Sequence, residues 1–342
     1  MFLDRARFHA LITTSALIAY ACARPPATSQ PGPMPAGAQL IPTRYAADRF
    51  FATAMTQRGD TAVFFLDTGS GSYLWDVYLP WFDLKPDSIA NLRGGKTAVV
   101  PFPSLRVDAS SPLAGTQSTG SRLQVYPIDY RAQNNFGAWI VRTTQAQFGY
   151  QWFGERIWTF DYPGKRLLFH QTAPPLSPKA RPLRLDFATD SAGRRLSQQA
   201  NLDIVVDGDT LSMIFDTGAT IWLSQNALSR VADGGPSERS SSHIFRWVFE
   251  RLHQRHPDWP VIEKADLWMG LDLIRVPSVM VAGYELGPAW LSVLNGPTTA
   301  PNVPASEPAW RRRRGGTIGG SLLRHFVITA DWPRGVASFV KR

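Results

Sequence analysis

Cysteine is nearly absent from this chain: among 342 residues there is only Cys22. A single cysteine excludes an intramolecular disulfide, so buried hydrophobic cores must hold the fold together. Charged residues are also sparse, at 18%, whereas hydrophobic residues make up 44%, a balance typical of a globular chain rather than a disordered one. The length is sufficient for two lobes of about 150 residues, each with a core of its own.

Several motifs that would indicate other chemistry are missing. The sequence has no glycine-rich phosphate loop and no Ser-His-Asp arrangement with supporting spacing. His253 and His256 have a spacing that suits a metal, but no cysteine or clear third ligand accompanies them, so we predict no metal site and no cofactor. The net charge of +9 is partly concentrated in 311–314, within a Pro-rich stretch. We interpret this stretch as a solvated loop and expect no nucleic-acid partner.

The N-terminus has the pattern of an export signal. Arg5 and Arg7 precede an apolar stretch at 10–21, which has the length of a signal-peptide core and is short for a permanent membrane span. We therefore predict a signal peptide at 1–21 and an exported chain. Cys22 resembles the acylated cysteine of a bacterial lipoprotein, and the Pro-, Ala- and Gly-rich segment 22–42 would then be a flexible tether.

Cleavage by an ordinary signal peptidase after Ala21 or Ala23 is the alternative to lipidation at Cys22. The expected location is the bacterial cell envelope, as a lipid-anchored periplasmic protein, or the medium outside the cell. Any contact with a membrane would be made only through this N-terminal lipid anchor.

The chain contains an internal repeat in two blocks. The first block, 58–69, aligns without gaps on 207–218, and six of the twelve positions are identical, including Asp-Thr-Gly at the end of each copy. The second block pairs 148–169 with 318–339. Each half of the chain thus begins and ends with the same pattern.

Both blocks have the pattern of short strands bounded by turns. Apolar and β-branched runs flanked by Gly, Asp or Pro predict strands at 61–66, 157–160, 167–169, 210–215, 327–330 and 336–340. An apolar stripe at helical spacing predicts an amphipathic helix at 242–254, which the first half lacks. We place an N-terminal lobe at 43–172, a Pro-rich linker at 173–182 and a C-terminal lobe at 183–342.

The repeated turns place two aspartates in equivalent positions, Asp67 and Asp216. If the halves pack about an approximate two-fold axis, the two carboxyl groups meet and share one proton, because two adjacent negative charges are costly. One could then activate a water as base while the other donates a proton as acid. Gly69 and Gly218 would allow close approach of the backbone, and residues 68 and 217, both threonines, could bond the two turns to each other.

These motifs resemble those of the pepsin- and retropepsin-like aspartic proteases over both halves. Residues 65–70 with Leu74-Trp75 look like the first active-site motif of pepsins, whereas 214–219 and 318–326 look like their bacterial retropepsin-like counterparts. The resemblance implies an all-β, two-lobed fold with a pseudo-two-fold repeat and a few short helices. It also implies a monomeric aspartic endopeptidase, a hydrolase without a cofactor, which acts on polypeptides.

The resemblance further assigns roles to the residues around the two aspartates. Asp67 and Asp216 would be catalytic, and the residues that support them would be Thr68, Gly69, Ser70, Thr217, Gly218 and Ala219. A hydroxyl at the position of Ser70 implies greater acidity, and Ala219 lacks it, so an intermediate pH optimum is expected. A flap could lie at 112–121, although no residue is assigned to it.

A second function remains open from the sequence. A non-catalytic envelope lipoprotein could keep the same fold and bind peptide or another partner in the cleft between the lobes. The intact pair of Asp-Thr-Gly motifs favours the enzyme over this alternative. A dimer of single-lobe subunits is disfavoured, because one chain already contains both halves.

Overall fold

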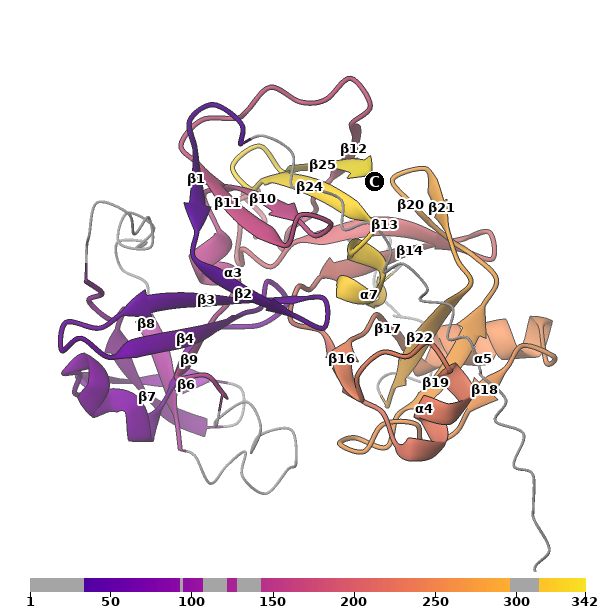
Figure 1. Ribbon diagram of the computed structural model, residues 1–342, viewed down its shortest axis with the longest axis horizontal. Helices are drawn as coiled ribbons and strands as arrows, with labels where there is room; N and C mark the ends of the chain where they lie inside the picture. Colours follow the sequence, from indigo (N-terminus) through magenta and orange to yellow (C-terminus); the bar gives the residue numbers. More distant parts are fainter. Residues whose placement is uncertain (1–33, 93–94, 107–121, 128–142, 296–313) are drawn as a thin grey trace, which may run out of the picture. The chain divides into compact units, whose positions relative to one another are not determined.

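The computed structural model describes residues 34–92, 95–106, 122–127, 143–295 and 314–342. These residues are predominantly β-structure, in three large sheets and one two-stranded sheet (Figure 1). The predicted all-β class is therefore confirmed. No helix within these ranges is long and apolar enough to cross a membrane.

The first large sheet is built from the N-terminal half. Its central strand β4 contributes the fully buried side chains of Phe64 and Leu66 to the main hydrophobic core. Strand β4 runs parallel to β9, with Leu66 opposite Phe148. In spatial order the strands are β2 (Thr43–Ala46), β3 (Arg49–Met55), β4 (Thr61–Leu66), β9 (Ala146–Phe148), β5 (Tyr73–Trp75), β8 (Arg122–Tyr126), β7 (Gly95–Pro101) and β6 (Ser88–Leu92).

The second large sheet is built from the C-terminal half and repeats the same parallel pairing. Here β14 runs parallel to β23, with Phe215 opposite Ile318. The spatial order is β18 (Val261–Ile262), β19 (Asp272–Val276), β22 (Ala289–Leu294), β17 (His243–Phe245), β23 (Arg314–Ile318), β14 (Asp209–Phe215), β13 (Asn201–Val206), β20 (Val279–Val281) and β21 (Tyr284–Leu286). Strands β15 (Thr220–Trp222) and β16 (Glu238–Ser240) form the two-stranded sheet.

The third large sheet combines strands from both halves. Its order is β1 (Ala38–Ile41), β11 (Arg166–His170), β10 (Ile157–Asp161), β24 (Phe326–Asp331), β25 (Val336–Lys341) and β12 (Arg181–Arg184). Figure 1 shows the magenta strands β10 and β11 beside the yellow strands β24 and β25. At the join, Thr159 lies opposite its repeat counterpart Thr329, and their hydroxyl oxygens are 2.9 Å apart.

Helices are short among the described residues. They are the 3-10 helix η1 (Asp76–Phe82) and the α-helices α3 (Tyr150–Phe153), α4 (Gln225–Val231), α5 (Arg246–Arg255) and α7 (Gly320–Leu323). The six strands predicted from the repeat are confirmed to within one residue at each end. The helix predicted at 242–254 is wrong at its start, because 243–245 form β17, which pairs with both β22 and β23. Sheet pairing there overrides the helical spacing of the apolar residues.

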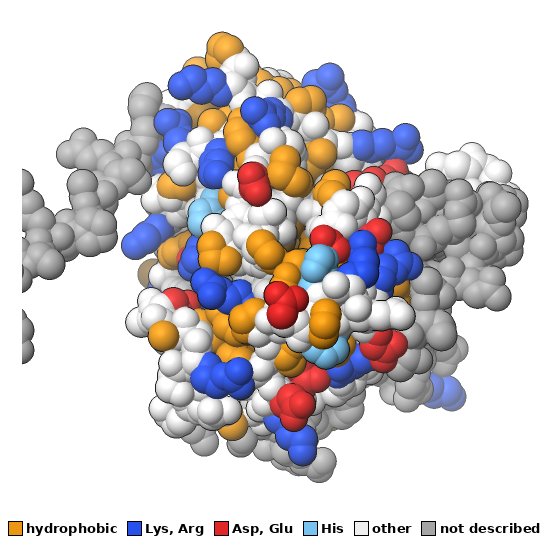
Figure 2. Space-filling model, turned by 90° about the vertical axis from the view of Figure 1, so that its right-hand side faces the viewer, with side chains coloured by type: hydrophobic (Ala, Val, Ile, Leu, Met, Phe, Trp, Pro, Cys, Tyr) orange, Lys and Arg blue, Asp and Glu red, His pale blue; other side chains and the backbone are white. Residues whose placement is uncertain are grey.

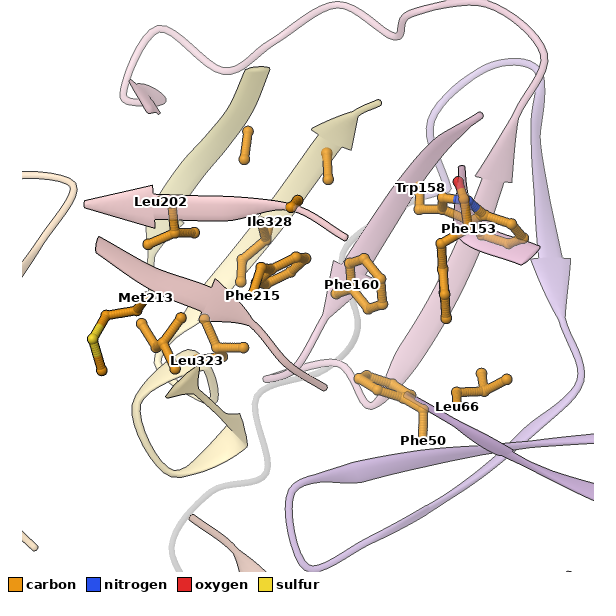
Figure 3. Packing of buried hydrophobic residues seen from close by; sticks show 14 of the residues in the cluster. Phe50, Leu66, Phe153, Trp158, Phe160, Leu202, Met213, Phe215, Leu323 and Ile328 are labelled. Atoms are coloured by element: carbon orange, nitrogen blue, oxygen red, sulfur yellow. The ribbon is translucent and has the colours of Figure 1, made fainter. Parts of the chain in front are cut away.

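One hydrophobic core extends through both halves. Figure 3 shows Phe160 of β10 beside Phe215 of β14, with Ile328 of β24 next to them. The ring centroids of Phe160 and Phe215 are 5.5 Å apart with the rings nearly perpendicular, a favourable edge-to-face arrangement. Because Phe215 directly precedes Asp216, this packing fixes the end of β14 from which that carboxyl group extends.

Candidate functional site

The two Asp-Thr-Gly turns begin where two equivalent strands end. The N–H of Asp67 donates to the carbonyl of Phe148 at 3.0 Å, and the N–H of Asp216 donates to the carbonyl of Ile318, also at 3.0 Å. The acceptors belong to β9 and β23, the parallel neighbours of β4 and β14. The sequence repeat therefore corresponds to a repeated local structure on the two sides of the site.

The structure brings the side chains of the two aspartates within hydrogen-bonding reach of each other, and each lies beside the glycine of the other turn. A β-carbon placed on Gly69 would lie 2.3 Å from Cγ of Asp216, and one on Gly218 would lie 2.4 Å from Cγ of Asp67. Such distances are far below van der Waals contact, so each turn requires glycine opposite the partner's carboxyl group. Each glycine N–H also donates to the aspartate of its own turn, at 2.9 Å for Gly69 and 3.0 Å for Gly218.

The threonines between these residues bond the turns to each other. The hydroxyl of Thr68 donates to the carbonyl of Phe215 at 2.6 Å, and the hydroxyl of Thr217 donates to the carbonyl of Leu66 at 2.9 Å. Both threonines are buried, with exposed fractions of 1% and 0%. Hydrogen bonds in such an environment are costly to break, so the four bonds that the two threonines make to the opposite half fix the separation of the carboxyl groups.

The residues after the two glycines make the site asymmetric. The hydroxyl of Ser70 donates to Oδ2 of Asp67 at 3.1 Å, whereas Ala219 has no hydroxyl to offer Asp216. The side-chain amide of Gln147 donates to the hydroxyl of Ser70 and to the carbonyl of Gly71. Asp67 thus has one more hydrogen-bond donor than Asp216 within the described residues.

Burial and mutual proximity change the acidity of the pair. Burial raises the pKa of Asp67, and hydrogen bonds from Asp216, Gly69 and Ser70 moderate the increase. Burial raises the pKa of Asp216 well above its usual value, and the neighbouring charge of Asp67 raises it further. The pair therefore holds one proton together at pH values where isolated aspartates are fully ionised.

Two supporting glutamines were missed by the sequence reasoning. The amide of Gln199 donates to the carbonyl of Gly69, and Gln147 contacts Ser70 as described above. Gln147 directly precedes the second repeated block, where the C-terminal half has Thr317, so its position next to the repeat was a usable signal. Gln199 lies outside both blocks, and no pattern in the sequence distinguishes it.

A buried ion pair beside the second turn was also missed. Arg49 of β3 is only 2% exposed; it pairs with Glu238 of β16 and donates to the hydroxyl of Thr220 at 3.1 Å. The hydroxyl of Thr220 in turn donates to the carbonyl of Gly218 at 2.8 Å. A side chain of the N-terminal half therefore supports the turn of the C-terminal half.

Other residues considered in the sequence lie elsewhere or outside the described ranges. Cys22 and the flap at 112–121 are outside them. His256 contacts Asp207 at 2.9 Å, and His253 stacks on Phe249. No group of three or more potential metal ligands occurs among the residues that the structure describes.

Basic side chains do not form a surface of one sign near these histidines. Asp209 pairs with both Arg251 and Arg255 of α5, and Arg255 also contacts Asp207. Figure 2 shows Lys and Arg side chains among Asp and Glu side chains on the face that it displays. This mixture gives no support to a binding surface for a polyanion on that face.

The comparisons with known proteins give no support to a protease. No protein-family model matches the chain, and no curated protein matches it. One solved structure that it resembles is EDGP, at 11% identity and a TM-score of 0.45, with 91% of this chain and 96% of that chain covered. Another is conglutin gamma, a basic 7S globulin from lupine seeds, at 11% identity and a TM-score of 0.46, with 90% and 96% covered.

These findings correct the predicted identity and activity. Neither solved structure is described as a protease. No family model supports the assignment to the pepsin- and retropepsin-like aspartic proteases, and that assignment is withdrawn. The aspartic endopeptidase activity and the hydrolase class of Asp67 and Asp216 are withdrawn with it. The physical reason is that two carboxyl groups sharing a proton are also a donor and an acceptor for a ligand, so the motif by itself does not specify hydrolysis.

Proposed function

We propose that this chain is a non-catalytic binding protein of the cell envelope, which holds an extended peptide segment against Asp67 and Asp216. The observation that carries the proposal is the hydrogen-bonding contact between these two carboxyl groups, which come from repeated turns and are both partly exposed. A pair in that state offers solvent a protonated oxygen and an ionised oxygen side by side.

The hydrogen-bonding groups of the pair complement those of a peptide. A protonated carboxyl group donates to a peptide carbonyl, and an ionised one accepts from a peptide N–H. The bond to the ionised oxygen is charge-assisted and therefore stronger than a neutral one. Recognition of this kind uses hydrogen bonds to the peptide backbone of the ligand and requires no chemical step.

The rigidity of the site favours binding. The reciprocal bonds of Thr68 and Thr217 hold the pair in place before a ligand arrives. Binding to a fixed pair loses less conformational entropy than binding to flexible side chains. The bonds from Gln147 and Gln199 add to this support.

The finer architecture belongs to the same proposal. We infer two lobes, at 43–172 and 183–342, related by an approximate two-fold repeat and joined through 173–182. The equivalent parallel pairings β4–β9 and β14–β23 support this inference, as does the opposition of Thr159 and Thr329. Export through the signal at 1–21, lipidation at Cys22 and the tether at 22–42 complete it, as inferences from the sequence alone.

A binding titration tests the proposal. A fluorescently labelled library of extended peptides is titrated with the full chain, and anisotropy reports the bound fraction. Asp67→Asn and Asp216→Asn should each weaken binding, because asparagine cannot share a proton with its partner. Asp258→Asn, at an exposed position, is the matched control and should bind as the parent does. Equal binding by all four proteins would contradict a role for the pair.

A further inference from the structure

A second cavity lies apart from the paired aspartates. Its volume is about 620 Å³, and neither Asp67 nor Asp216 lines it. Its walls come from β15, α4, β16, β19, β22 and α7, and Asp48 from the turn between β2 and β3 completes them. A volume of this size falls in the range of small-molecule sites.

One wall of the cavity is apolar. Ile221, Leu223 and Leu273 belong to a separate hydrophobic cluster on which Val231 and Trp290 pack, and all five side chains line the cavity. Trp290 is partly exposed. This wall can take up an apolar body of a ligand by removing it from water.

The lining of the cavity carries more positive than negative side chains. Four arginines face two aspartates, Asp48 and Asp233, and those aspartates already pair with Arg324 at 3.3 Å and Arg239 at 2.6 Å. Two arginines therefore remain without a carboxylate partner in the lining.

The two remaining arginines differ in how many of their hydrogen-bond donors are available to a ligand. Arg230 donates to the carbonyl of Val261 at 3.0 Å, and a neutral carbonyl does not compensate the charge of the guanidinium. Arg275 is exposed, and its guanidinium makes no hydrogen bond or ion pair among the described residues. Arg275 lies opposite Trp290 in the pairing of β19 with β22, so the free cation and the aromatic ring share one sheet face.

We propose that this cavity binds a small organic anion, with a carboxylate at Arg275 and a short apolar body on the wall of Trp290. Arginine is suited to this role because its planar guanidinium matches a carboxylate in two parallel hydrogen bonds. A fatty acid and the C-terminal carboxylate of an apolar peptide present the same chemistry. This site is independent of the one formed by Asp67 and Asp216.

Calorimetric titration of the full chain with decanoate tests the proposal, with decanol as the neutral counterpart. We expect decanoate to bind and decanol to bind at least about tenfold more weakly. A second arm compares acetyl-Leu-Phe as the free acid with its amide, and preference for the acid over decanoate would identify a peptide C-terminus as the source. Equal binding of decanoate and decanol, or no binding of either acid, would overturn the proposal.

Variants locate the carboxylate and separate a local effect from unfolding. Arg275→Gln should weaken decanoate binding about tenfold, whereas Arg194→Gln, an exposed arginine outside the cavity, should leave it unchanged. Ala289→Phe should reduce binding of decanoate by filling the cavity. Asp216→Asn should leave decanoate binding as in the parent, and a loss there would overturn the independence of the two sites. Thermal unfolding of each variant confirms that it is folded.

Discussion

Thr68 and Thr217 exchange hydrogen bonds in both directions: each hydroxyl donates to a carbonyl of the other strand, and each accepts from the other's N–H, at 3.2 and 3.0 Å. The residues are 149 positions apart in the chain. This relationship joins the two halves at the point where their aspartates meet. The bonds that hold the two aspartates together therefore also form one of the contacts between the halves.

Thr217→Val should destabilise the protein. Valine keeps the shape of threonine but leaves the N–H of Thr68 and the carbonyl of Leu66 buried without a partner. We expect a loss of about 3 kcal/mol in the free energy of unfolding. Urea unfolding measures it, and Thr217→Ser, which keeps the hydroxyl, should lose much less. Equal stability of the valine and serine variants would show that the bonds contribute little.

Asp216→Asn should stabilise the protein increasingly as the pH rises. Burial and the charge of Asp67 raise the pKa of Asp216, so the folded state binds its proton more tightly than the unfolded state does. The stability from this proton is complete below the unfolded pKa and is lost as the pH rises through the folded pKa. Asparagine has no proton to lose.

Thermal unfolding of the parent and of Asp216→Asn at about pH 4 and about pH 8 measures this effect. The variant's advantage in melting temperature should be larger at the higher pH. Asp258→Asn, at an exposed position, provides the baseline. An equal advantage in melting temperature at both pH values would mean that ionisation of Asp216 does not destabilise the folded state.

Gly69→Ala should abolish peptide binding at the pair. The added methyl group would stand 2.3 Å from Cγ of Asp216 and must displace that carboxyl group. Gly71→Ala is the matched control, because its nearest contact, the side-chain nitrogen of Gln151, is at an ordinary 3.5 Å. Anisotropy titration of both variants gives the comparison. Binding that survives in Gly69→Ala would place the ligand away from Asp216.

The repeat in the sequence accounts for much of the local structure. The strands at 61–66 and 210–215 could be predicted because their patterns are local, and the motif copies predicted that Asp67 and Asp216 would meet. The start of β17 could not be predicted from the sequence, because the strands that pair with it, β22 and β23, are distant in the chain. The predicted endopeptidase activity went beyond the sequence evidence, because the motif determines the geometry of two carboxyl groups but not what they do to a ligand.

Contacts between single residues of distant segments could not be predicted from the sequence either. Arg49 has no repeat counterpart that would indicate burial, and charged residues are rarely buried. Its partner Glu238 is 189 positions away in the numbering, so only the folded chain reveals the pair. The cavity beside Arg275 likewise depends on elements from both halves of the chain.

Arg49→Met should destabilise the protein by about 3 kcal/mol, because Glu238 would be left partly buried without its cation. Burial already raises the pKa of Glu238 despite the neighbouring guanidinium of Arg49. The double variant Arg49→Met with Glu238→Leu should recover most of the loss, since it removes both charges. Urea unfolding of the three proteins distinguishes the outcomes. A double variant that is less stable than Arg49→Met would mean that the ion pair itself is not the source of the loss.

Mass spectrometry of a peptide library incubated with the full chain distinguishes binding at Asp67 and Asp216 from cleavage there. The library is sampled over time from about pH 3 to about pH 8, alongside Asp67→Asn and Asp216→Asn. Binding without chemistry predicts that captured peptides are recovered at their intact masses, with less capture by both variants. Cleavage products that form with the parent and disappear in both variants would show that the pair hydrolyses peptides and does not only bind them.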